Sequence, residues 1–136
     1  MKDTLNCSVC NFDYSHLITT IEVNDNDEYE TTEFVINSQH RIPAKIDYLF
    51  RTQGNIHLLF RCEEGHFFIK SFDGHKGNVF IDENPLMDDL VAYLNVLNKE
   101  PQNLTSSWNL SFGLLGQIET FLKTQETLCK QKIRNR

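Results

Sequence analysis

Two pairs of metal-binding side chains, far apart in the sequence, constrain this chain more than any other feature. Cys7 and Cys10 form a Cys-x-x-Cys pair, and Cys62 and His66 form a second pair with three residues between them. A structural zinc ion takes four sulfur or nitrogen ligands in a tetrahedron, commonly from two narrow turns. The sequence therefore predicts a structural Zn²⁺ site whose metal ligands are Cys7, Cys10, Cys62 and His66.

Residues beside both pairs favour tight turns. Asn11 directly follows the first pair, and Gly65 lies within the second. Asn tolerates a positive φ better than most residues, and glycine adopts one without steric cost. We expect these two residues to let the chain reverse so that the two ligands of each pair converge.

Other chemistries remain open from the sequence. His75 lies in the next glycine-flanked turn and is an alternative to His66 as the fourth ligand. A redox Cys-x-x-Cys pair of the thioredoxin type is disfavoured, because the expected βαβ context is missing. A zinc-dependent hydrolase would use Glu63 or Glu64 as its base, but the chain lacks the His-Glu-x-x-His and deaminase motifs.

Alternating apolar residues and turn signals predict an antiparallel meander in the first part of the chain. Strands are expected at residues 17–23, 33–37, 45–52, 56–62, 66–72 and 78–81. Asn24 to Asp27 should form a turn, because Asn and Asp favour turn geometry. Pro43 should end any strand before residue 45, since proline has no N–H for a sheet.

The pattern changes at Asn84-Pro85, a typical helix start. A first helix is expected to run from Pro85 to about Lys99, and a second to begin at residues 105–109 and to be broken or delayed near Gly113 and Gly116. The predicted class is α+β: an antiparallel zinc-ribbon-like sheet over residues 1–83, followed by a C-terminal helical hairpin over residues 84–136. The helical region should pack within the chain, which gives a monomer. The alternative is a homodimer that forms through the second helix.

The net charge of −6 comes from one segment, residues 22–33, which we call the acidic strip. The strip contains six acids and no Lys or Arg, and the other thirteen acids equal the thirteen Lys and Arg residues in number. Such a strip can occupy a basic groove on a host protein, or simply form a solvated loop. The candidate partner-binding residues are Glu22, Asp25, Asp27, Glu28, Glu30 and Glu33.

The C-terminal end is basic. It carries one acid, Glu126, and five bases, which are Lys123, Lys130, Lys132, Arg134 and Arg136. Bases at a helix C-terminus complement the helix dipole, and they also contact nucleic-acid phosphates. The first interpretation is favoured, and nucleic-acid binding is the alternative.

No apolar run is long enough to cross a membrane, and the first residues lack the features of a signal peptide. We therefore expect a cytoplasmic protein without membrane association. In that reducing compartment, paired cysteines are metal ligands or free thiols more often than disulfides.

Three segments carry a resemblance to a known group: Cys7-x-x-Cys10, Phe60-Arg-Cys62-Glu-Glu-Gly65-His66-Phe67 and His75-Lys76-Gly77-Asn78-Val-Phe80. In this order they resemble small zinc-ribbon-like accessory proteins of bacteriophages and other bacterial mobile elements. The resemblance covers residues 7–81, and Asn11 stands where the group usually has glycine. It implies a metal-stabilised β domain in an accessory protein.

The expected function is therefore a non-enzymatic zinc-binding accessory protein that binds a host protein, such as a defence or DNA-processing factor. Two alternatives are a nucleic-acid-binding regulator that uses the basic C-terminal helix, and a zinc-dependent hydrolase.

Overall fold

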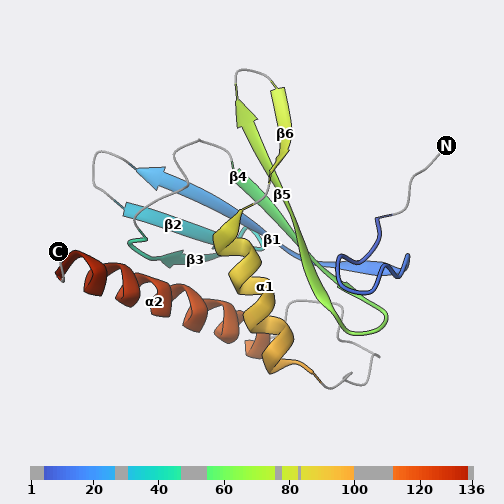
Figure 1. Ribbon diagram of the computed structural model, residues 1–136. Helices are drawn as coiled ribbons and strands as arrows, with labels where there is room; N and C mark the ends of the chain where they lie inside the picture. Colours follow the sequence, from blue (N-terminus) through green and yellow to red (C-terminus); the bar gives the residue numbers. More distant parts are fainter. Residues whose placement is uncertain are drawn as a thin grey trace.

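The computed structural model describes residues 5–26, 31–46, 55–75, 78–82, 84–99 and 112–134. In these residues one antiparallel sheet is followed by two helices (Figure 1). The strands are β1 (Ser15–Asn26), β2 (Thr31–Ile36), β3 (His40–Pro43), β4 (Asn55–Cys62), β5 (Phe67–His75) and β6 (Asn78–Asp82). The helices are α1 (Pro85–Leu97) and α2 (Phe112–Arg134). The predicted α+β class, with an antiparallel sheet before C-terminal helices, is confirmed.

The sheet is not the simple meander that the sequence predicts. Its strand order is β3-β2-β1-β4-β5-β6, and every neighbouring pair is antiparallel. Because β1 pairs with both β2 and β4, it joins the two strands β2 and β3 on one side to the three strands β4, β5 and β6 on the other. β1 is also irregular, with a register shift between Leu17 and Thr19.

One strand lies where none was expected, and one turn prediction is wrong. The third strand lies at His40–Pro43, and residues 44–46 belong to no strand, while residues 47–52 lie outside the described part of the chain. β3 is an edge strand that pairs only with β2, so Pro43 can end it without a second neighbour that needs its N–H. Asn24 to Asn26 continue β1 instead of forming a turn, because they pair with β2 up to Thr31.

Both helices cover the same side of the sheet (Figure 1). Ile21 pairs with Ile36 and Val23 pairs with Phe34, so these four buried side chains share this face. The same core takes in buried residues of both helices, which are Leu86, Met87, Leu90, Leu94, Ile118, Phe121 and Leu122. The helical region therefore packs on the sheet within one chain.

The helix boundaries follow local signals in α1 but not in α2. The side chain of Asn84 accepts a hydrogen bond from the N–H of Met87 at 3.2 Å, and Pro85 begins α1 as predicted. α2 runs without a break through Gly113 and Gly116, although glycine costs about 1 kcal/mol in a helix. Burial of the apolar stripe that includes Ile118 outweighs that cost. Residues 105–111, where the start was expected, lie outside the described residues.

A second, smaller apolar cluster lies on the opposite face of the sheet. Leu59 belongs to the helix-side core, so the alternation of a strand places Phe60 and Cys62 on the other face. Phe60 stacks on Phe68 with ring centroids 5.2 Å apart, and Cys7 completes the cluster with Cys62. This cluster fixes the N-terminal segment to the sheet and positions the site described next.

Candidate metal centre

The first turn contains Cys7 and Cys10. The N–H of Asn11 donates to the carbonyl of Cys7 at 2.9 Å, and the N–H of Cys7 donates to the carbonyl of Phe12 at 2.9 Å. Asn11 has a φ of 62°, which confirms the positive φ predicted from its residue type. The chain therefore turns sharply enough for both cysteine side chains to reach one point.

The second turn connects β4 to β5. The N–H of Cys62 donates to the carbonyl of His66, and the N–H of Gly65 donates to the carbonyl of Cys62, each at 2.9 Å. Gly65 has a φ of 91°, which also confirms the expectation from sequence. The turn thus presents Cys62 and His66 on the same side.

The two turns meet at one end of the sheet. Ligand atoms of Cys7, Cys10, Cys62 and His66 all lie within 4.8 Å of one another. The Sγ atoms of Cys10 and Cys62 are 3.7 Å apart, and Sγ of Cys62 is 3.5 Å from Nδ1 of His66. The structure brings together the four residues that the sequence proposed, and they could hold one metal ion.

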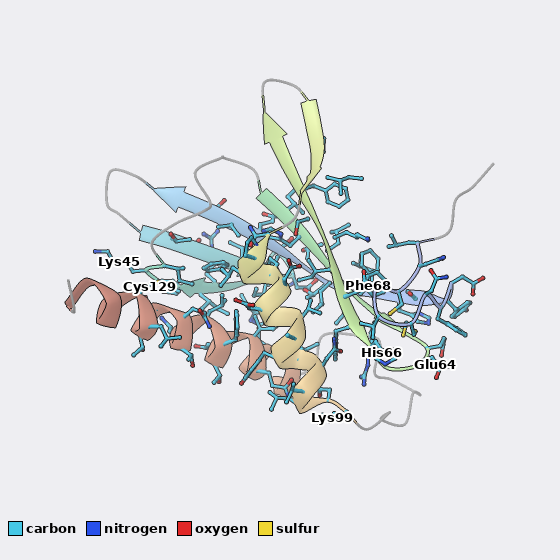
Figure 2. All side chains as sticks on the ribbon, viewed as in Figure 1. Lys45, Glu64, His66, Phe68, Lys99 and Cys129 are labelled. Carbon is cyan, nitrogen blue, oxygen red and sulfur yellow. The ribbon has the colours of Figure 1, made fainter. Side chains whose placement is uncertain are left out.

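The fourth cysteine does not take part. Cys129 lies on α2 beside the helix-side core, whereas His66 and Phe68 lie at the other end of the molecule (Figure 2). Cys129 is therefore a free, half-buried thiol and not a ligand of this cluster.

The four residues of the cluster differ in their exposure to solvent. Cys7 and Cys62 are buried, His66 is half-buried and Cys10 is exposed. An ion held here would be shielded by the sheet and would face solvent at Cys10.

Local electrostatics differ between the two buried thiols. Burial opposes ionisation of Cys7, but hydrogen bonds from the backbone of Cys10 and Val9, together with those from the Cys62 and Cys10 side chains, lower the pKa of this thiol. Burial raises the pKa of the Cys62 thiol to about 11. A metal ion that bound Cys62 as a thiolate would displace its proton at neutral pH, so metal binding here would be coupled to proton release.

The alternative ligand His75 is excluded by the course of β5. The strand continues through Asp73 and Gly74 to His75, instead of turning at Asp73 as predicted. At about 3.3 Å per residue, His75 stands roughly 26 Å along the strand from Phe67, which follows His66. His75 therefore lies at the far end of β5 and cannot replace His66.

The two acids of the second turn lie in different environments. Glu63 Oε1 is 2.9 Å from Nε2 of His16, and both side chains are half-buried. Glu64 is exposed. The carboxylate of Glu63 is thus held beside the cluster by its contact with the imidazole of His16 in β1.

The acidic strip is only partly described. Glu22 lies half-buried in β1, Glu33 in β2 forms an ion pair with Arg41 at 2.7 Å, and Asp25 is in β1. Asp27, Glu28 and Glu30 lie outside the described residues. Partner binding by the strip stays a prediction.

Two bases of the C-terminal helix, Lys123 and Lys130, contact the protein itself. Nζ of Lys123 donates to the carbonyl of Pro43, and Nζ of Lys130 lies 3.7 Å from the carboxylate of Glu126. The Lys123 contact attaches α2 to the end of β3, and the Lys130 contact lies within α2 itself, so both are structural uses of basic residues.

Two residues near the cluster were missed by sequence reasoning. The first is Arg61, which the structure buries. A charged residue in a mainly apolar predicted strand, directly before a proposed ligand, was a signal that the sequence offered. Asn95 of α1 bonds to Phe67, the residue after His66, and no local pattern indicates this contact.

Searches of protein-family models, curated proteins and solved structures found no match to this chain. Within the part of the chain that the structure describes, neither helix combines the length and apolar character needed to cross a membrane.

Proposed function

We propose that this chain is a non-enzymatic, zinc-stabilised accessory protein of a phage or mobile element, and that it acts by binding a host protein. The observation that carries the metal part is the convergence of three thiols and one imidazole from two separate turns. The accessory role is supported by the resemblance described above. The host-binding role is supported by the surface described below.

Zinc is the metal that this ligand set favours. Thiolates and imidazoles are soft or borderline ligands, which suit Zn²⁺ better than Mg²⁺ or Ca²⁺. With Zn–S bonds of about 2.3 Å and Zn–N bonds of about 2.0–2.1 Å, tetrahedral ligand atoms lie roughly 3.5–3.8 Å apart. The Cys10–Cys62 and Cys62–His66 distances of 3.7 and 3.5 Å match this spacing.

A structural role fits better than a catalytic one. Catalytic zinc sites keep one coordination position for water, whereas four protein ligands fill a tetrahedron. Glu63, the half-buried candidate base, is already engaged by His16. Zinc would therefore fasten the first turn to the β4–β5 turn and contribute directly to the folding free energy.

The experiment for the metal site uses the full chain purified without chelators. Elemental analysis should give one zinc per chain, and less than half an equivalent would overturn the site. Cys62→Ser should remove the zinc. Cys129→Ser is the matched control, because it changes the same atom outside the cluster, and it should keep the wild-type zinc content.

The face of the sheet opposite the helices is the proposed partner surface. Glu22 pairs with Ile56, Ile56 with Phe72, and Phe72 with Ile81, so these residues form one row across the sheet. Ile81 and Val79 in β6 are 79% and 73% exposed, and Ile56 is 39% exposed. A solvent-facing side of an antiparallel sheet is usually polar, so exposed apolar residues here indicate a contact surface.

The charge of this face defines the chemistry of the partner. Glu22 and Glu33 are on the same face as Ile56, because Glu22 pairs with Val35 and Glu33 is two residues from Val35. Glu33 is paired with Arg41 on this face, so Glu22 is the acid that would meet a basic residue beside the apolar patch of the partner. Such charges mainly increase the association rate and the specificity.

Binding is tested with the full chain as bait in a bacterial host lysate, followed by purification of any captured protein. Ile81→Asp should abolish binding of the purified partner, whereas Leu97→Asp, a matched change on α1 at a residue that is 49% exposed, should not. Glu22→Gln should slow association at low salt. Equal affinity of the wild type and Ile81→Asp would overturn this surface.

A further inference from the structure

Arg61 contacts the residues on both sides of the ligand His66. It lies in β4 directly before Cys62, and only 4% of its surface is exposed. Its Nε donates to the carbonyl of Gly65 at 3.2 Å. Its guanidinium carbon lies 4.8 Å from the ring centroid of Phe67. Arg61 therefore lies on the helix-covered side of the sheet and holds the turn that carries His66.

The charge of Arg61 needs a compensating anion. A guanidinium stays protonated in proteins, and a buried charge without a partner is strongly unfavourable. Within the described residues, no salt bridge joins Arg61 to a carboxylate, and its buried Nη2 has no hydrogen-bond partner. Burial lowers the pKa of Arg61, and the Coulombic interaction with Cys62 opposes that change.

A metal centre with these ligands supplies the missing negative charge. Three thiolates, one neutral imidazole and one divalent ion carry a net charge of −1, which the single positive charge of Arg61 would offset. We propose that Arg61 is a positioning residue of the metal centre, which balances its net negative charge and holds the turn of His66. This inference rests on the proposed zinc site.

The test compares two variants of Arg61 with a control. Arg61→Met keeps a long side chain beside Phe67 but removes the charge and the hydrogen bond to Gly65. Arg61→Lys keeps the charge but lacks the planar donor group of arginine. Arg41→Met is the matched control, because Arg41 is exposed and pairs with Glu33 in another part of the sheet.

Zinc affinity is measured on the purified full chain by competition with a chromophoric chelator. Neighbours that orient metal ligands typically change affinity by 10–100-fold, so we expect Arg61→Met to weaken binding by roughly that factor. Arg61→Lys should weaken it by a smaller factor, and Arg41→Met should leave it unchanged. Circular dichroism of the zinc-loaded proteins establishes that each variant is folded.

A spectroscopic measurement separates charge balance from simple packing. In the Co²⁺-loaded protein, loss of a nearby positive charge raises the energy of the thiolate electrons. The thiolate-to-cobalt absorption band of Arg61→Met should therefore shift to longer wavelength. A residue with only a packing role would leave the band in place.

The outcomes are distinct. A wild type that binds no zinc overturns the metal site and this inference with it. If the wild type binds zinc, wild-type affinity or an unshifted band in Arg61→Met overturns the role of Arg61 alone. If Arg61→Met does not fold, Arg61→Lys decides: a loss of about threefold or more supports the proposal, and wild-type affinity overturns it.

Discussion

Asn95 of α1 makes two hydrogen bonds to the backbone of Phe67 in β5. Its Oδ1 accepts from the N–H of Phe67 at 2.8 Å, and its Nδ2 donates to the carbonyl of Phe67 at 3.0 Å. Phe67 directly follows His66, so this contact connects the helix layer to the second metal turn. The candidate metal centre is thereby supported from the helix-covered face as well as by its own turns.

Replacement of Asn95 by Ala should weaken both the fold and the site. Each hydrogen bond contributes about 1 kcal/mol, so we expect Asn95→Ala to lower the free energy of unfolding by about 2 kcal/mol. The loss should be accompanied by weaker zinc binding, because the residue after His66 is no longer held. Denaturant unfolding of the zinc-loaded chain and chelator competition measure the two effects.

Asn98→Ala provides the matched control. The side chain of Asn98 donates to the carbonyl of Leu94 and to Oε1 of Gln117, so it joins the helices and not the strand. This variant should be destabilised to a similar degree while keeping wild-type zinc affinity. An equal loss of affinity in both variants would show that the effect of Asn95 is only global destabilisation.

The candidate site was predictable because its information is local. Cys7 and Cys10, and likewise Cys62 and His66, are close enough in sequence for their spacing to specify a turn. Asn11 and Gly65 occupy positions where a positive φ is needed, and the structure has both. The start of α1 was predictable for the same reason, since Asn84 and Pro85 act within one helical turn.

The remaining features depend on contacts between distant segments. Nothing in the sequence around β1 indicates that it pairs with β4 as well as β2, and this pairing places the two turns together. The strand at Pro43 was missed because the tolerance for proline depends on being at an edge. The role of Asn95 arises only once α1 lies against β5.

Removal of the metal should loosen one region and leave the rest folded. Within the described residues, the N-terminal segment packs on the sheet through the small cluster of Cys7, Cys62 and Phe68, which is separate from the helix-side core. We expect chelation to increase hydrogen exchange in residues 5–14 and 62–67 while α1 and the centre of β1 stay protected. Hydrogen-exchange mass spectrometry measures this pattern, and uniform loss of protection would contradict it.

Gly116→Ala should stabilise the protein. Gly116 is exposed within α2, and a Cβ atom at this position would meet no other atom within 4 Å. Alanine favours a helix over glycine by about 0.5–1 kcal/mol, so the free energy of unfolding should rise by that amount.

Gly65→Ala is the opposite case, because a φ of 91° strains any side chain, and it should destabilise the chain. Denaturant midpoints measure both, and a lower midpoint for Gly116→Ala would contradict the expectation.

Glu126 should make part of the stability depend on pH. Its carboxylate accepts a hydrogen bond from the backbone N–H of Lys45, and this bond, with the attraction of Lys123 and Lys130, lowers the pKa of Glu126. A carboxyl whose pKa is lower in the folded than in the unfolded chain stabilises the fold. This stabilisation is fully present at pH values above the unfolded pKa, roughly 4.3, and is lost as the pH falls through the folded pKa. We therefore expect Glu126→Gln to be less stable than the wild type by about 1 kcal/mol at pH 7, with the difference shrinking towards pH 3.

Chemical denaturation of both proteins across this pH range measures the difference, and loss of metal at low pH affects both equally. Glu119→Gln is the control, because Glu119 is exposed on the same helix, and it should change stability by less than about 0.5 kcal/mol at either pH. A difference between wild type and Glu126→Gln that stays constant from pH 7 to pH 3 would show that the contact with Lys45 does not depend on the charge of Glu126.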